Sequence, residues 1–194
     1  MLGNDSASAG TAAVVGVDRR ARRREATKDE ILEAAWTLAR TQGLTLFSLR
    51  DLAAGVGMRA PSLYEYFASK NAIYDAMFGM GMRQALAVVG AETRAPGVRE
   101  ALRESAHRVF DFATSDPARN QLLFQRTIPG FEPSPESYAP AVEMSARVQA
   151  LMIDHGITHG DAMDLWTALI GGLVNQQLAN EPGGQRWGRL IDRA

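Results

Sequence analysis

The sequence predicts an all-α fold, and two observations carry that prediction. Apolar residues recur at positions i, i+3, i+4 and i+7 through most of the chain, which is the spacing of one helix face. None of the 194 residues belongs to a segment with the strict alternation of a half-buried strand, and no repeat period is evident. Because 46% of the residues are hydrophobic, the chain can bury a substantial core in one or two domains.

Composition removes several classes of protein. The chain has no cysteine, which excludes disulfides, thiol redox chemistry and thiolate metal sites. No apolar run approaches the roughly 18 residues that span a bilayer. The opening MLGNDSASAGTAAVVG lacks the basic start and the long apolar region of a signal peptide. We therefore expect a cytoplasmic protein that does not associate with membranes.

The first predicted helix follows a stretch that is expected to be disordered. Residues 1–18 are small and polar, and we predict a disordered tail there. Thr27 and Glu30 have the spacing of a capping box, so the helix is predicted to begin near Thr27. Gly43 is expected to end it.

The next two predicted helices are short and are joined by a glycine turn. Ser48 and Asp51 repeat the capping spacing, and Gly57 supplies the turn. Two apolar faces of helical period flank that turn: Leu49, Leu52, Ala53 and Val56 before it, and Ala60, Leu63, Tyr64 and Phe67 after it. Helices this short fold only against the preceding helix. The arrangement is that of a helix-turn-helix, whose second helix is sized for a DNA major groove.

The rest of the chain predicts further helices. Ser69 can cap a helix that runs to about residue 92, and Pro117 opens another that ends before Pro129. Other helices are expected over about 98–115, 136–154 and 159–180, with a last helical segment over 185–194. The stretch PGFEPSPESYAP carries four prolines, so we expect a loop or a very short helix there.

Contact with DNA needs cations and hydroxyls for phosphates and side chains that reach base edges. The face of the third helix opposite its apolar residues offers such groups: Arg59, Pro61, Ser62, Glu65 and Tyr66. A basic cluster precedes the first helix: Arg19, Arg20, Arg22, Arg23 and Arg24. It can lie along the DNA backbone or reach a minor groove, although an arginine run is more often a solvated tail.

The stretch from Thr27 to about Phe78 resembles the DNA-binding domain of the TetR family of transcriptional regulators. The family pattern is met by Leu52, Ala53, Gly57, Pro61, Ser62, Leu63, Tyr64, Tyr66, Phe67, Ser69 and Lys70. The chain departs from that pattern where Val56 and Met58 replace alanine and valine. Arg59 stands where a serine usually caps the recognition helix, which removes a cap worth about 1 kcal/mol.

The resemblance implies a homodimer in which each subunit supplies one recognition helix to a half-site of a double-stranded DNA operator. Those helices must lie about 34–36 Å apart, or a multiple of that distance. The resemblance implies that the family's phosphate and base contacts are made here by Ser48, Arg50, Arg59, Ala60, Pro61, Ser62, Tyr64, Tyr66 and Lys70. We therefore expect residues 19–70 to form a DNA-binding domain with a basic arm, and residues 71–194 a helical effector-binding and dimerisation domain.

The resemblance also predicts that the last two long helices pair with those of a second subunit. Leu165, Leu169, Gly172 and Leu173 form a stripe suited to such an interface, although an ordinary core accounts for the stripe as well. Candidates for an effector pocket are Met77, Met80, His107, Phe110, Phe124, Trp166 and Asn175. Each of these residue types is more often a core residue than a ligand contact.

We expect neither cofactor nor metal, and no enzyme activity. His155 and His159 are separated by Gly156 at a helix junction, and the sequence has no phosphate loop or nucleophile elbow. The sequence favours a DNA-binding repressor that responds to a small apolar or amphipathic effector. The alternative is a helical small-molecule carrier or protein-interaction module with a vestigial helix-turn-helix.

Overall fold

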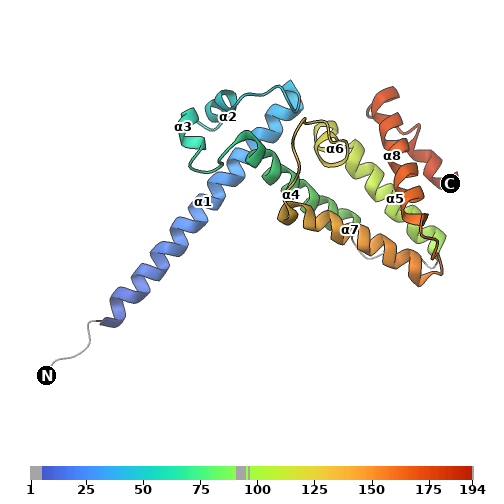
Figure 1. The fold of residues 1–194 in the computed structure, drawn as a ribbon, viewed down its shortest axis with the longest axis horizontal. Helices are drawn as coiled ribbons and strands as arrows, with labels where there is room; N and C mark the ends of the chain where they lie inside the picture. The colour runs from blue at the N-terminus through green and yellow to red at the C-terminus, as the bar shows by residue number, and fades with distance from the viewer. Residues whose placement is uncertain (1–5, 91–94, 96, 194) are drawn as a thin grey trace.

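The computed structural model describes the backbone of residues 6–90, 95 and 97–193, and the side chains from residue 19 onward. Helices account for all of the regular structure in these residues, which confirms the all-α prediction. The molecule is elongated, with the N-terminal part of α1 projecting from one end and α5 and α8 at the other (Figure 1). None of the helices within the described ranges is long and apolar enough to cross a membrane.

Helix α1 spans Ser6–Gln42 and begins well before the predicted start at Thr27. The capping box at Thr27 does not form. Instead, the Thr27 hydroxyl donates to the carbonyl of Arg23 at 3.0 Å, as threonines inside helices do. The preceding residues are rich in alanine and arginine and contain no proline, so nothing ends the helix there. The helix therefore includes residues 6–18, part of the stretch for which a disordered tail was predicted, and residues 1–5 lie outside the described part. The disorder itself stays a prediction.

Local signals predicted the next helix starts correctly. Helix α2 (Leu49–Gly55) begins after Ser48, whose side chain forms the complete capping box with Asp51. Helix α4 (Lys70–Val89) begins after Ser69, whose hydroxyl accepts from the backbone N–H of residue 72 at 3.1 Å. Gly57 has a φ of +68°, the left-handed conformation that its turn requires.

Helix α3 (Ala60–Leu63) is a single turn, and residues 64–66 continue it as turns rather than as helix. The predicted helix across Phe67 is therefore too long. Arg59 occupies the N-cap without a side-chain hydrogen bond, as expected from the missing serine. Leu63 and Phe67 are nevertheless both buried. The apolar spacing therefore predicted correctly which side chains anchor the segment to the core.

The remaining helices are α5 (Val98–Thr114), α6 (Pro117–Phe124), α7 (Pro135–Asp154) and α8 (Ala162–Asn180), followed by a 3-10 helix at Gly188–Arg193. Helix α7 starts inside the proline-rich stretch, where a loop or a very short helix was expected. Ser134 caps it, and Pro135 occupies the first turn, where the missing N–H costs nothing. Asp75 on α4 holds that cap, since its carboxylate accepts from the backbone N–H and the hydroxyl of Ser134 at 2.6 and 2.9 Å.

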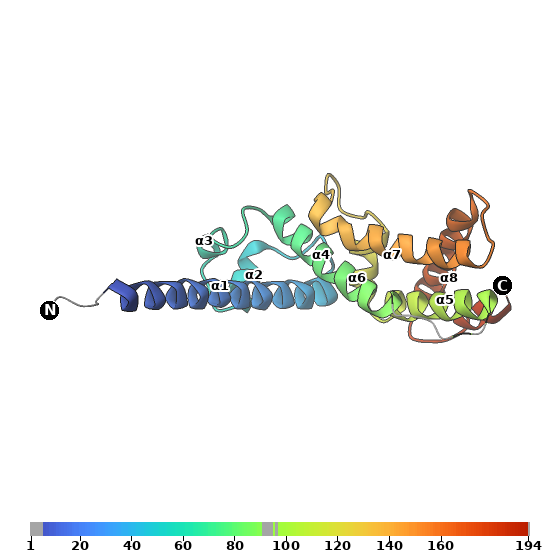
Figure 2. The same cartoon turned by 90° about the horizontal axis from the view of Figure 1, so that it is seen from below.

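Helix α4 connects the two halves of the molecule. It packs against α1 on one side and lies alongside α7 on the other, as Figures 1 and 2 show. One continuous core therefore includes Ile31 and Leu52 from the N-terminal helices and Met82 and Leu122 from α4 and α6. A second, smaller core lies between α5 and α8, where Phe110 packs near Ile170.

Candidate nucleic-acid interface and effector cavity

The segment around α3 is anchored on one face and open on the other. Leu63 is almost fully buried in the core, whereas the side chain of Tyr64 is 56% exposed. Arg59 and Pro61 are exposed as well, and Ser62 is half-buried. The structure thus brings the predicted recognition residues together on one accessible surface, as entry into a DNA groove requires.

Two residues predicted to contact DNA also contact each other. The Arg24 guanidinium donates to the backbone carbonyl of Glu65, and it lies over the Tyr66 ring at 5.1 Å from the centroid. This contact joins α1 to the recognition segment and leaves Tyr66 half-buried. No local sequence pattern could have revealed it, because the partners are 41 residues apart.

The other arm arginines project from a helix. Arg19, Arg20, Arg22 and Arg23 are exposed along α1, which runs beside the N-terminal domain and extends past α3 (Figure 2). The basic cluster thus belongs to the first helix, and its arginines project from the helix surface.

Ser48 and Lys70, both predicted to contact phosphates, have partners inside the domain. The Ser48 hydroxyl donates to the Asp51 carboxylate at 2.6 Å, and its hydrogen bonds hold the pKa of that carboxyl below the ordinary value. The Lys70 ammonium donates to the carbonyls of Phe47 and Thr45 at 2.7 and 3.1 Å. Burial lowers the pKa of Lys70. An ammonium has three N–H donors, so one remains for a phosphate.

The loop between α1 and α2 is fixed by the same group of side chains. The Tyr74 hydroxyl donates to the carbonyl of Leu44 at 2.9 Å, and burial raises the pKa of Tyr74 to about 12. The Lys70 ammonium lies 4.6 Å from the ring centroid of Phe47 and 5.4 Å from that of Tyr74. These contacts place exposed Ser48 and Arg50 at the start of α2, on the border of the recognition surface.

The C-terminal helices surround a cavity of about 740 Å³ that is partly open to solvent. Residues of α4, α5, α6, α7 and α8 line it, together with the loop that follows α6. Its size lies within the range of small-molecule sites, about 300–1,000 Å³. Three of the predicted pocket residues line the cavity: Phe124, Trp166 and Asn175.

The other four pocket candidates lie elsewhere. Met77 is completely buried in the larger core, and Met80 packs against that core. Phe110 is buried between α5 and α8. His107 is on the surface, where its Nε2 lies 2.9 Å from a carboxylate oxygen of Asp192. The sequence analysis missed Asn120, which lines the cavity from α6 and is only 2% exposed.

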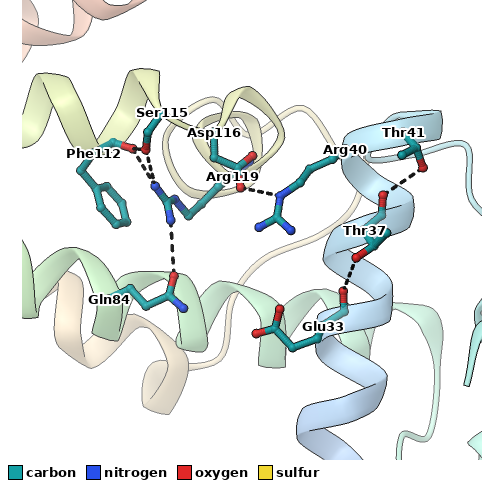
Figure 3. A network of polar contacts seen from close by, with 9 residues as sticks. All are labelled: Glu33, Thr37, Arg40, Thr41, Gln84, Phe112, Ser115, Asp116 and Arg119. Carbon is teal, nitrogen blue, oxygen red and sulfur yellow. Dashed lines mark hydrogen bonds and ion pairs between the residues drawn. The ribbon is translucent and has the colours of Figure 1, made fainter.

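A polar network links the cavity helix α6 to the DNA-binding half. Asp116 caps α6, and its carboxylate accepts from Nε of Arg40 on α1 at 2.8 Å (Figure 3). One turn further along α6, Arg119 stacks over the Phe112 ring at 3.8 Å and donates to the carbonyl of that residue at 2.8 Å. Burial lowers the pKa of Arg119, against the opposing effect of the Asp116 charge.

Residues 31–77, the stretch that contains the helix-turn-helix, match the model of the family described as "Bacterial regulatory proteins, tetR family". This stretch is a TetR-family helix-turn-helix domain, the DNA-binding part of a transcription regulator. None of the curated proteins matches the sequence of this chain at a significant level.

Solved structures of regulatory proteins share the fold over most of this chain. The regulator PfmR from Thermus thermophilus is 20% identical, with a TM-score of 0.64 over 84% of this chain and 97% of that chain. A TetR-family regulator from Marinobacter aquaeolei is 21% identical, with a TM-score of 0.63 over 88% and 94%. The fatty acid degradation regulator FadR from Bacillus halodurans is 14% identical, with a TM-score of 0.63 over 86% and 90%. At these identities the likeness establishes the fold.

Proposed function

We propose that this protein is a cytoplasmic, homodimeric repressor of the TetR family that binds a palindromic operator and releases it when a small apolar or amphipathic effector occupies the cavity. We assign it no enzymatic activity. The observation that carries the proposal is the recognition segment, which is anchored by Leu63 and Phe67 and presents its opposite face to solvent. A carrier would have no use for that exposed face.

The proposed DNA contacts are those of the helix-turn-helix. Tyr64, Ser62 and Arg59 face the groove from the recognition segment, while Ser48 and the third N–H of Lys70 contact phosphates on either side. The complete proposed set is Ser48, Arg50, Arg59, Ala60, Pro61, Ser62, Tyr64, Tyr66 and Lys70. The arginines on α1 extend the contact along the DNA backbone, which strengthens binding without selecting sequence.

The proposed dimer interface is the outer face of α8, completed by α7. Leu165 is 64% exposed and Leu169 is 46% exposed, although both are large and apolar. Just beyond Leu169, Gly171 and Gly172 have open space where a side chain would stand, and both also line the cavity. Leu173, predicted to belong to the same stripe, is buried in its own subunit instead. Paired helices of this kind would hold the two recognition segments at a fixed separation.

Effector response is proposed to pass through α6. This helix lines the cavity, and Asp116 at its start pairs with Arg40 of α1. An effector that binds the arrangement unable to hold DNA more tightly than the other shifts the population towards release. A ligand with equal affinity for both arrangements would change nothing.

The experiment is a gel shift with the DNA immediately upstream of the protein's own coding region, repeated across a salt series. The proposal expects a sequence-selective band that weakens steeply as salt rises, because phosphate contacts release counterions. Sedimentation of the free protein should show a dimer. A carrier or interaction module with a vestigial helix-turn-helix would give no such band.

A further inference from the structure

The walls of the cavity carry almost no charge. Its lining is mainly apolar and aromatic, with Phe78, Met82 and Trp166 among its members. Within the described residues, Arg126 is the single charged side chain of the lining, and it lies at an exposed position after α6. A cationic group inside this cavity would lose its water without gaining a partner of opposite charge, which is costly.

One polar group in this apolar lining is unpaired. Asn120 is almost fully buried, and its side-chain Nδ2 has no hydrogen-bond partner among the described residues. Two other buried nitrogens share this condition, Nε of Arg119 and Nε1 of Trp187, but neither residue lines the cavity. A buried amide without a partner destabilises a fold, so its presence calls for an explanation.

The position of Asn120 fits a ligand-binding role better than a structural one. Its backbone N–H continues the helix by donating to the carbonyl of Asp116 at 2.9 Å, so the fold needs only the backbone there. The other asparagine of the lining, Asn175, differs because it is exposed and its Oδ1 accepts from Gln125 at 2.7 Å. Asn120 therefore places an unpartnered donor in the wall of a mainly apolar cavity.

We propose that the cavity binds an uncharged, mainly apolar molecule bearing a carbonyl oxygen, and that Nδ2 of Asn120 donates a hydrogen bond to that oxygen. This inference rests on the proposed role of the cavity as the effector site and names the chemical class of its ligand. The carbonyl satisfies the buried amide, while the rest of the molecule fills the aromatic and aliphatic lining. Cationic ligands are disfavoured because no acidic side chain of the described residues lines the cavity.

The test uses four naphthalenes of nearly equal shape as competitors of the fluorescent dye N-phenyl-1-naphthylamine. They are 2-acetylnaphthalene, 2-ethylnaphthalene, 2-naphthoate and 1-(2-naphthyl)ethylammonium. Each is titrated against the full-length wild-type protein and the Asn120→Leu variant, with Asn180→Leu as the matched control. Asn180 is exposed at the end of α8 and does not line the cavity.

The decisive quantity is the ratio of the affinity for the acetyl compound to that for the ethyl compound, compared between wild type and variant. The two compounds differ in hydrophobicity by the same amount in both proteins, so that difference cancels in the comparison. Asn120→Leu should lower this ratio by about tenfold, while Asn180→Leu leaves it unchanged. The ammonium compound should not displace the dye, and the naphthoate should displace it less well than the ketone, because the proposed ligand is uncharged. Asn120→Leu should also raise the melting temperature of the free protein, because it removes an unpaired buried amide. If Asn120 served packing alone, the substitution by leucine would instead lower the melting temperature.

An unchanged ratio in Asn120→Leu, displacement by the ammonium as strong as by the ketone, or a wild-type protein that does not bind the acetyl compound would each overturn the inference. The operator gel shift of the same samples separates this inference from the function on which it rests. A protein that shifts DNA but does not bind the ketone keeps the proposed regulation and loses the carbonyl site. One that binds the ketone through Asn120 but shifts no DNA retains the site and loses the repressor.

Discussion

Replacing Lys70 by methionine tests the helix-turn-helix most directly. The Lys70 ammonium donates hydrogen bonds within the domain and is also proposed to contact a DNA phosphate. Lys70→Met keeps the aliphatic stem and removes the charge. It loses hydrogen bonds to the carbonyls of Phe47 and Thr45 at 2.7 and 3.1 Å, and the contact with the Tyr74 ring. A hydrogen bond to a charged group contributes about 1.5–3 kcal/mol. The site is only partly buried and water can replace the ammonium, so we expect a loss of about 2 kcal/mol for the pair.

The same substitution should change how operator binding depends on salt. Each phosphate contact contributes about 0.9 to the slope of log K against log salt concentration. A homodimer has two copies of Lys70, so the slope should fall by about 1.8. Urea unfolding measures the stability, and fluorescence anisotropy of labelled operator DNA between about 50 and 200 mM salt measures the slope.

Lys28→Met is the control for stability. Lys28 forms a 2.9 Å ion pair with Glu25 within α1, a surface contact whose loss should stay within about 0.5 kcal/mol. Unchanged stability in Lys70→Met would refute the inference that the ammonium fixes the loop between α1 and α2. Lower stability with an unchanged salt slope would remove Lys70 from the DNA contacts and leave it a structural residue.

Three further predictions concern other parts of the molecule. In a double-mutant cycle of Arg40→Ala and Asp116→Asn, the coupling energy in urea unfolding should be about 1 kcal/mol, because asparagine keeps the helix cap and removes only the charge. Leu165→Glu should convert the dimer to a monomer in sedimentation and weaken operator binding by at least about tenfold, because it places a charge in the proposed α8 interface. Tyr74 should stay protonated up to a pKa of about 12, measured by phenolate absorbance.

The sign of the Tyr74 effect follows from its raised pKa. Folding favours the neutral phenol, so this contribution to stability is complete below the unfolded pKa of about 10 and is lost as the pH rises through about 12. A pKa raised from about 10 to about 12 corresponds to roughly 3 kcal/mol. Ionisation of Tyr74 near pH 10 would contradict its burial against the Leu44 carbonyl. A coupling energy near zero would show that Arg40 and Asp116 act independently, and a dimer that survives Leu165→Glu would place the interface elsewhere.

Features that depend on neighbours in sequence were predictable, and those that depend on distant packing were not. The caps at Ser48 and Ser69 and the turn at Gly57 are local, so their residue types predicted α2 and α4 correctly. Thr27 was wrong as a helix start because its capping spacing also occurs inside helices. The helix propensity of the preceding residues extends the helix past this position.

The cavity lining also contains residues that the sequence predicted and residues that only the packing of distant helices reveals. Phe124 and Trp166 were predicted to line it from composition alone, whereas Met77 has a similar sequence context and lies in the core. The burial of Asn120 arises only when five helices pack together, and nothing in its neighbourhood of α6 signals it. The contact of Arg40 with Asp116 joins residues 76 positions apart and was equally inaccessible.

Helix α1 is continuous, so it connects the contact with α6 directly to the basic cluster. Arg40 near one end contacts the cavity helix, and Arg22 lies 18 residues towards the other end, about 27 Å away at 1.5 Å per residue. A tilt of about 5° pivoting at Arg40 would carry the basic end sideways by roughly 2 Å, which is enough to break hydrogen bonds to phosphates. A small adjustment beside the ligand would thus be magnified where the protein grips its operator.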